Sequence, residues 1–272
     1  MRILVRLLLA SLLASPGLEQ PCFAAESANN IRIGKLVIES NSLPDADRER
    51  IIHLFQQKAY CQPEIGPRIE GALRNLGYIK AVVDEPKFSF PAQGKGRRVA
   101  YVIAKVEPGA QSRLGEIYIQ KMTIFPSTQL RNLFPLRRGD LFNTTRFAEG
   151  MEDLRKLYAT RGYTDVVAVP QVSIDASRHT VDLVVDVDEG RPYDFGKLYL
   201  EGVEPHAGAG KALMNSWKPL EGKRYNPVEL QHWLRGNHVA WKVGTRISDS
   251  MRMLPDPESH VINVKLTQWP DC

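Results

Sequence analysis

This chain lacks the residue patterns that the common enzyme classes need. It contains no Gly-x-Ser-x-Gly and no His-Glu-x-x-His motif, and its three cysteines include no pair at metal-ligand spacing. The six histidines have no cysteine or carboxylate beside them in a ligand pattern. Residues 208–211, Gly-Ala-Gly-Lys, lack the earlier glycine and the following Ser or Thr of a phosphate-binding loop. We therefore expect a non-enzymatic protein with no metal site and no cofactor.

Apolar runs long enough to cross a bilayer are also missing. The stretch at residues 7–14 is far shorter than the roughly 18 to 20 residues that a membrane-spanning helix needs. Arg2 and Arg6 lie on the N-terminal side of this stretch, and Pro16 and Gly17 follow it. Small residues just before the bond after Ala24 suit a signal-peptide cleavage site there. Residues 1–24 are therefore predicted to be a secretory signal peptide, with an uncleaved anchor as the weaker alternative.

Long blocks of like charge are absent as well, although the formal net charge is +5. The basic pairs at residues 97–98 and 137–138 are isolated, and acidic residues lie between them and along the whole chain. Because nucleic-acid binding needs basic residues gathered on one face, and export removes the chain from nucleic acid, we expect no such partner. A weak peripheral attraction to an anionic membrane surface stays open.

What the sequence does contain is an internal repeat. Gly34, Gly115 and Gly196 are spaced 81 residues apart and lie in the similar segments IRIGKLVIES, SRLGEIYIQK and YDFGKLYLEG. A fixed period of this length indicates one supersecondary unit that recurs along the chain. The chain is predicted to contain three units of about 80 residues each.

The middle unit shows the order of elements most clearly. It predicts a strand at residues 113–120, a short helix at 127–134, a second helix from Asn143, and a hairpin that turns at residues 175–178. The second helix has an apolar stripe that faces a core, and the return arm of the hairpin alternates apolar and acidic residues. The members of the stripe are Phe147, Met151, Leu154 and Leu157, and the apolar members of the arm are Val181, Leu183, Val185 and Val187.

The other two units repeat this order. In the third, Asn226 and Pro227 are typical of a helix N-terminus, with Asn as the N-cap and Pro at the first helical position. In the first, helices are predicted at residues 45–57 and 64–76, with the regular part of the second helix beginning at Pro67, and strands at residues 79–90 and 97–106.

The Gly-Tyr pairs at residues 77–78 and 162–163, the junctions VDVDEGRPYDFGKLYLEG and AKVEPGAQSRLGEIYIQ, and the order of elements carry a resemblance. Over residues 31–270 the chain resembles tandem polypeptide-transport-associated (POTRA) domains. The resemblance implies an α+β protein of three β-α-α-β-β units, each a small three-stranded sheet covered by two helices. The units are placed at residues 31–110, 111–190 and 191–272, and the third is degenerate because Gly236-Asn237 replaces the Gly-Tyr pair.

The resemblance also implies a location and a role. POTRA arrays stand on the periplasmic side of outer-membrane barrel-assembly and two-partner-secretion proteins, so we expect an exported periplasmic protein that could associate with the outer membrane. The array is usually followed by a barrel, and we expect none within this chain, which would then act as a binding scaffold. The expected partners are an outer-membrane barrel protein or its unfolded clients. The alternative is an envelope-assembly or structural adaptor that meets no barrel protein.

Partner binding is expected at sheet edges. In the resembled fold, the strand after the second helix is an edge strand that can accept a partner strand. Pro86 and Pro170 interrupt two of these strands, which suits an edge but also limits strand addition, so the third unit is slightly preferred. The residues assigned to partner binding are Val82, Val83, Val166, Val167, Val243, Thr245 and Ile247.

Two features of composition leave alternatives open. Beyond the predicted signal peptide, Cys61 and Cys272 are the two cysteines, and an oxidising compartment favours pairing. They could form an intramolecular disulfide in an array that folds back on itself, join two chains in a disulfide-linked dimer through Cys272, or remain reduced. The four tryptophans, all in the third unit, exceed what a small core needs, so some are expected at a partner surface.

Overall fold

The structure is a computed structural model of the whole chain. It describes residues 30–56, 59–91, 99–202, 205–206, 208–237 and 251–267. The expected sites Val243, Thr245, Ile247 and Cys272 and the predicted signal peptide lie outside these residues. Among the described residues, no helix combines the length and the apolar character that a membrane crossing requires.

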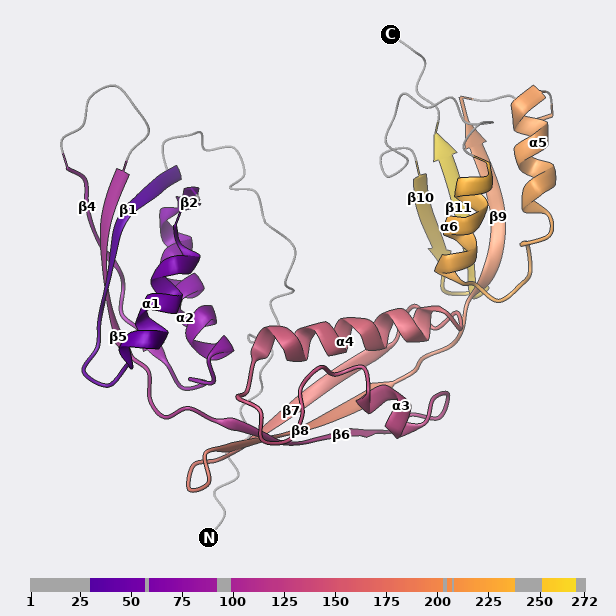
Figure 1. Ribbon diagram of the computed structural model, residues 1–272. Coiled ribbons are helices and arrows are strands. Elements are labelled where there is room, and N and C mark those ends of the chain that lie inside the picture. The colour runs from indigo at the N-terminus through magenta and orange to yellow at the C-terminus, as the bar shows by residue number, and fades with distance from the viewer. Residues whose placement is uncertain are drawn as a thin grey trace. The chain divides into compact units, whose positions relative to one another are not determined.

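The described chain forms three separate sheets, and each sheet has its helices on one face (Figure 1). This is the α+β architecture of three β-α-α-β-β units that the sequence predicts. By compactness, the chain divides into two bodies, which we describe separately. The first contains residues 1–120, 128–151 and 170–185, and the second contains residues 121–127, 152–169 and 186–272.

The first unit has the largest sheet, with the strand order β2-β1-β5-β3 and β4 also paired to β5. Strands β1 and β5 are parallel, and the other pairs are antiparallel. Its elements are β1 (Asn30–Glu39), α1 (Asp45–Leu54), β2 (Ala59–Cys61), the 3-10 helix η2 (Gln62–Glu64), α2 (Ile65–Asn75), β3 (Val82–Val83), β4 (Lys87–Ser89) and β5 (Val99–Glu107).

The second and third units have three-stranded sheets with the orders β6-β8-β7 and β10-β11-β9. The second unit contains β6 (Arg113–Gln120), α3 (Ser127–Arg131), α4 (Thr144–Ala159), β7 (Val167–Asp175) and β8 (Thr180–Asp188). The third contains β9 (Asp194–Glu201), α5 (Gly208–Trp217), α6 (Pro227–Gly236), β10 (Met251–Asp256) and β11 (Val261–Thr267).

The predicted apolar faces form the cores. Val181, Leu183, Val185 and Val187 of β8 are buried, as the alternation predicts. In α4, Phe147, Met151 and Leu154 are buried, but the fourth buried position is Tyr158, and Leu157 is only half-buried. A spacing of 11 residues from Phe147 fits the 3.6-residue period better than a spacing of ten, which is why Tyr158 faces inward.

Several predicted boundaries move for local reasons. Helix α3 ends at Arg131, four residues before Pro135, and not at Phe134, because the residue preceding a proline disfavours helical geometry. Helix α2 begins at Ile65, so Pro67 lies within its first turn, where no intrahelical N–H bond is lost. The N-cap prediction at Asn226 is confirmed, because its side chain accepts a hydrogen bond from the N–H of Val228 at 2.9 Å.

The predicted single strand over residues 79–90 is wrong. It is divided into β3 and β4, with residues 84–86 between them. Pro86 has no N–H and cannot donate to the ladder, so pairing with β5 stops before it and resumes at Lys87.

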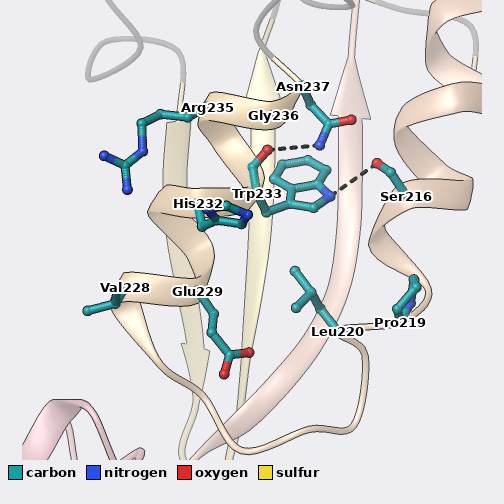
Figure 2. A pocket seen from close by; sticks show the side chains of 10 residues that line it. All are labelled: Ser216, Pro219, Leu220, Val228, Glu229, His232, Trp233, Arg235, Gly236 and Asn237. Atoms are coloured by element: carbon teal, nitrogen blue, oxygen red, sulfur yellow. Dashed lines mark hydrogen bonds between the residues drawn. The ribbon is translucent and has the colours of Figure 1, made fainter.

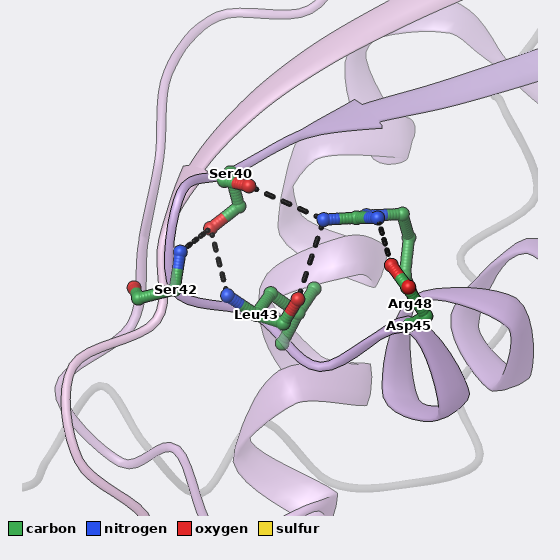
Figure 3. Close-up of polar contacts among 5 residues, drawn as sticks. All are labelled: Ser40, Ser42, Leu43, Asp45 and Arg48. Atoms are coloured by element: carbon green, nitrogen blue, oxygen red, sulfur yellow. Dashed lines mark hydrogen bonds and ion pairs between the residues drawn. The ribbon is translucent and has the colours of Figure 1, made fainter.

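The turn between β1 and α1 is held by polar contacts among its own residues (Figure 3). The hydroxyl oxygen of Ser40 accepts hydrogen bonds from the N–H groups of Ser42 and Leu43. Arg48, in the first turn and a half of α1, donates to the carbonyls of Ser40 and Leu43 and pairs with Asp45. The arginine therefore satisfies carbonyls of the turn and fixes how the chain enters the helix.

The three periodic glycines mark irregular points in the first strand of each unit. In the pairing of β1 with β5, the register shifts beside Gly34. The pairing of β9 with β11 has a register shift of its own. A Cβ at Gly115 would lie 2.0 Å from the Asp182 carboxylate, and one at Gly196 would lie 2.3 Å from the Asn263 amide oxygen. Glycine therefore recurs every 81 residues because a side chain of the neighbouring strand approaches the backbone so closely that only glycine fits.

Two further glycines connect successive units, each within one compact body. Gly77 and Gly162, which follow α2 and α4, have φ values of +90° and +85°. Their carbonyls accept the N–H of Ser112 at 2.9 Å and of Tyr193 at 2.8 Å, at the start of the next unit. Both glycines are therefore needed for a left-handed backbone that brings the following unit against the end of a helix.

Candidate partner-binding edges

Each sheet has one edge covered by its own chain. In the first unit, β2 pairs with β1 through residues 59–61. In the second, Leu114 exchanges backbone hydrogen bonds with Gly139 and Asp140, and in the third Phe195 does so with Gly222 and Lys223. In all three units the covering segment immediately precedes the second helix. The covered edges are those of β1, β6 and β9.

The opposite edges are formed by β3 and β4, by β7 and by β10. These are the strands after the second helix, as the sequence analysis expected. Within the part of the chain that the structure describes, no strand pairs with their outer sides. An edge of this kind is the position at which a further strand can be added to a sheet.

The first unit combines its open edge with a groove. Val82 is 56% exposed and Val83 is half-buried. Beside them lies a cavity of about 680 Å³ between α2 and the edge. The apolar lining comes from Pro63, Pro67, Val83, Pro86 and Phe88.

The rim of this groove is acidic. Glu70, Asp84 and Glu85 line it. Glu70 pairs with Arg74 and Asp84 lies 3.8 Å from Lys105, so both charges are partly offset. The groove can therefore receive an apolar side chain from a segment that lies along the edge, with a polar rim around it.

The second open edge is longer. Strand β7 has nine residues and includes Pro170. Val167 is 54% exposed, whereas Val166, just before the strand, is buried. Of the two residues assigned here from sequence, only Val167 offers its side chain to a partner.

The third open edge is described only from Met251. Strand β10 exposes Met253 and Leu254, whose side chains point to opposite faces of the strand, and Pro255 follows them. The preferred docking residues Val243, Thr245 and Ile247 lie outside the described residues. The preference for the third unit therefore stays a prediction.

A second cavity, of about 580 Å³, lies between α5 and α6 in the third unit (Figure 2). Trp233 donates from Nε1 to the hydroxyl oxygen of Ser216 at 3.1 Å, and Asn237 donates to the carbonyl of Trp233 at 2.8 Å. Leu220 and Val228 add apolar surface. The lining comes from α5, α6, the segment between them and Asn237 at the end of α6, and no residue of β10 contributes to it.

The tryptophans on these helices belong to the core. Trp217 is 1% exposed and Trp233 is 7% exposed, and their rings meet edge to face with centroids 4.9 Å apart. Trp217 also donates to the carbonyl of Gly196 at 2.9 Å. These two belong to the core, while Trp241 and Trp269 lie outside the described residues, so the expectation that some tryptophans lie at a partner surface stays a prediction.

Cys61 is buried at the end of β2, next to the 3-10 helix. A short strand and a 3-10 turn thus precede α2 here. Its expected partner Cys272 lies outside the described residues, so the disulfide and the disulfide-linked dimer stay predictions.

The buried ionisable groups serve structural contacts. Burial and a hydrogen bond of 2.8 Å to Asp47 raise the pKa of Tyr78 to about 12. Although partial burial opposes ionisation, hydrogen bonds from Thr123, Ile124 and Tyr158 hold the pKa of Glu189 below its usual value. Within the described residues, no three His, Cys, Asp or Glu side chains gather in a way that could hold a metal ion.

Sequence reasoning missed the covered edges and both grooves. The strand β2 has only three residues, and the segments that cover β6 and β9 contribute isolated bridges. No periodic pattern marks such short segments. The spacing of Gly34, Gly115 and Gly196 was the one available signal that the first strands have a close neighbour.

Comparison with known proteins agrees with this geometry. Residues 112–190 match the POTRA family, described as "Surface antigen variable number repeat". POTRA domains 3–5 of BamA from Haemophilus influenzae are 19% identical, with a TM-score of 0.61, covering 88% of this chain and 96% of that one.

Two further structures are similar in part. BamA from Haemophilus ducreyi lacking POTRA domains 1–3 is 16% identical over 58% of this chain and 29% of that chain, with a TM-score of 0.41. POTRA domains 1–3 of the periplasmic domain of Omp85 from Anabaena are 14% identical over 86% and 93%, with a TM-score of 0.34. Residues 112–190 thus match the POTRA family, and over most of its length the chain has the fold seen in a tandem POTRA array.

Proposed function

We propose that this protein is an exported, non-enzymatic scaffold in outer-membrane protein assembly or protein transport. It captures an extended segment of its partner by adding that segment to an open sheet edge. The partner is an outer-membrane barrel protein or an unfolded client of one. The observation that carries the proposal is the coincidence, in the first unit, of an open strand edge with an apolar groove beside it.

The edge supplies affinity and the groove supplies selectivity. An added strand gains main-chain hydrogen bonds, and every second side chain of that strand points toward the same face. A side chain entering the groove meets Val83 and Phe88 on the strand side and Pro67 on the helix side. Pro86 limits the usable edge to a short stretch, so the proposed capture is brief and reversible.

Val83 offers a direct test of strand addition. Asp84 donates its N–H inward to the carbonyl of Lys105 at 3.0 Å, so the alternation of the strand turns the N–H of Val83 outward. Val83→Pro removes that outward donor while the inward bond of Asp84 remains. Val83→Thr is the matched control, because it retains the N–H and the branched shape.

The experiment is photocrosslinking in the native envelope, with a photoreactive residue at Val82 and a second probe at Val167. Leu54, which is 60% exposed and lies on α1 away from the edges, is the control position. We expect a barrel protein or its client at Val82 and not at Leu54, with the Val82 product lost in Val83→Pro and kept in Val83→Thr.

Other outcomes decide against the proposal. Equal capture at Leu54 would show that trapping does not depend on an edge. Capture of soluble periplasmic factors alone would favour the adaptor that meets no barrel protein. Recovery of the chain with its first 24 residues intact and in the cytoplasm would contradict export.

A further inference from the structure

The outer face of the first sheet, away from its helices, carries exposed apolar and basic side chains. Strand pairing places Lys35 opposite Tyr101 and Val37 opposite Ile103, while Lys87 of β4 lies opposite Ile103 on its other side. Tyr101 is 45% exposed and Ile103 is 41% exposed. We call this surface the basic–aromatic face and define it as Arg32, Lys35, Val37, Lys87, Tyr101 and Ile103.

The charge on this face is one-sided. Arg32, Lys35 and Lys87 are exposed, and among the described residues none of the three forms an ion pair. The acidic groups lie toward the other end of the sheet, where Glu39 is opposite Lys105 and Asp84 is 3.8 Å from Lys105. An uncompensated positive charge therefore surrounds the exposed tyrosine and isoleucine.

The internal repeat indicates that Tyr101 is not there for the fold. The residues at the equivalent 81-residue positions are Asp182 and Asn263, whose side chains accept the N–H of Glu116 at 2.8 Å and of Lys197 at 2.7 Å. The phenol of Tyr101 instead lies over Gly34, whose Cβ would be 3.4 Å from the ring. The first unit thus lacks the side-chain-to-backbone hydrogen bond that the other two units make at this position. It exposes the ring of Tyr101 instead.

In the second unit, Glu116 of β6 is paired with Arg138 at 3.0 Å, and Asp186 of β8 is paired with Lys121 at 2.9 Å. Tyr118, two residues after Glu116, is 57% exposed. Both units therefore expose a tyrosine on the outer sheet face, but among the described residues the basic residues near it are ion-paired in the second unit and not in the first. The difference between the two faces argues for a ligand of defined charge.

We propose that the basic–aromatic face docks on an anionic membrane surface. Tyrosine and isoleucine suit the boundary between head groups and acyl chains, since a phenol is apolar along its ring and polar at its tip. Lysine and arginine are drawn to anionic lipid, and their long stems let the charged ends reach the phosphates. Because strand pairing brings Lys35, Lys87, Tyr101 and Ile103 together on one face of the sheet, these side chains can contact such a surface at the same time.

The test is flotation of the exported chain, isolated from cells, with two kinds of vesicle. One contains phosphatidylcholine alone, and the other contains phosphatidylcholine mixed with phosphatidylglycerol. We expect binding to the anionic vesicles only, weakening as salt is added. Lys35→Glu combined with Lys87→Glu should reduce binding by about tenfold or more, because each basic residue near the surface contributes about fivefold.

A matched variant separates the face from net charge. Lys211→Glu combined with Lys218→Glu, on exposed positions of the third unit, changes the charge by the same amount and should leave binding nearly unchanged. Equal loss in both pairs, binding to neutral vesicles, or no binding at all would overturn the proposal. Self-association without vesicles that Lys35→Glu and Lys87→Glu abolish would overturn it in favour of a second copy.

Tyr101→Asn tests the aromatic anchor without risking the fold. Asparagine occupies the equivalent place in the third unit, so this variant should unfold at the same denaturant concentration as the parent or a higher one. We expect its binding to anionic vesicles to fall severalfold. A folded Tyr101→Asn protein that binds as the parent does would exclude the ring as a contact with lipid.

Discussion

The carboxylate of Asp182, on β8, accepts a hydrogen bond of 2.8 Å from the backbone N–H of Glu116, on β6. It reaches that N–H across Gly115, where a Cβ would lie 2.0 Å from the same oxygen. Asn263 makes the equivalent contact to Lys197, across Gly196. A side chain on one strand therefore completes the backbone bonding of its neighbour in two of the three units.

Asp182→Ala should destabilise the second unit, because it leaves the N–H of Glu116 without this acceptor. We expect a loss of about 1 to 3 kcal/mol in the free energy of unfolding. Asp182→Asn should cost much less, since Asn263 makes the same bond in the third unit. Urea unfolding followed by circular dichroism would measure both, and an equal loss in the two variants would contradict a role for the side-chain oxygen.

Gly162→Ala should weaken the connection between the second and third units. The residue has φ +85°, and a Cβ would lie 2.6 Å from the carbonyl oxygen of Tyr193. Gly222→Ala is the control, because Gly222 has φ +77° but no atom within 4 Å of a Cβ. Both variants should lose about 1 to 2 kcal/mol of stability, because alanine disfavours a positive φ. In thermal unfolding, Gly162→Ala should lose more stability than Gly222→Ala. Equal losses would show that the close approach has no cost.

Tyr78 should make stability fall at high pH. Its pKa is raised to about 12 in the folded protein, by burial and by the bond to Asp47. Between pH 10 and 12 the unfolded chain ionises this phenol and the folded chain keeps the proton, so the free energy of unfolding decreases as pH rises. Each such group contributes a slope of up to about 1.4 kcal/mol per pH unit.

Tyr78→Phe should therefore reduce this alkaline slope, although it also loses the hydrogen bond to Asp47. Urea unfolding at several pH values from neutral to alkaline would give the slope. Tyr199→Phe, at an exposed tyrosine on β9, is the comparison and should leave the slope unchanged. If the free energy of unfolding of Tyr78→Phe decreases just as steeply at alkaline pH, other tyrosines cause the decrease.

Glu189→Ala should destabilise the second unit near neutral pH. The carboxylate accepts hydrogen bonds from the N–H groups of Thr123 and Ile124, both at 2.8 Å, and from the hydroxyl of Tyr158 at 2.7 Å. Its pKa is lowered in the folded protein, so the stability that it contributes is present above its ordinary pKa and disappears as pH falls through the lowered one.

We expect Glu189→Ala to cost about 1.5 to 3 kcal/mol near neutral pH, where the carboxylate is charged. The difference from the parent should shrink in acid. Glu149→Ala, at an exposed position on α4, is the control and should have little effect. Chemical unfolding at neutral and acidic pH would show both, and a loss that does not change with pH would contradict the role of the charge.

Local patterns predicted the elements that have a regular repeat. The apolar stripe of α4 and the alternation of β8 are properties of neighbouring residues, so they could be identified without a structure. Asn226 was recognised as an N-cap for the same reason, since its bond reaches only to Val228. Where the prediction was wrong, as at residues 79–90, one proline had divided a strand.

The candidate sites depended on contacts that no local pattern contains. The groove beside Val83 is lined by Pro67 of α2 and by Phe88 of β4, which are brought near each other only by the fold. The basic–aromatic face exists because β1, β4 and β5 bring Lys35, Lys87 and Tyr101 onto one surface. The groove and the basic–aromatic face each combine residues from at least two elements. The packing and pairing of those elements determine which residues become neighbours.

The sequence by itself determined that one unit recurs, in what order its elements follow, and which faces of those elements are apolar, because periodicity and turn chemistry are local. Only the tertiary structure decided which edge of each sheet is covered, why Gly115 and Gly196 must be glycines, and where Tyr101 points. These depend on residues far apart in the sequence that meet only when the sheet has formed, such as Glu116, whose backbone N–H bonds to the carboxylate of Asp182, 66 residues away.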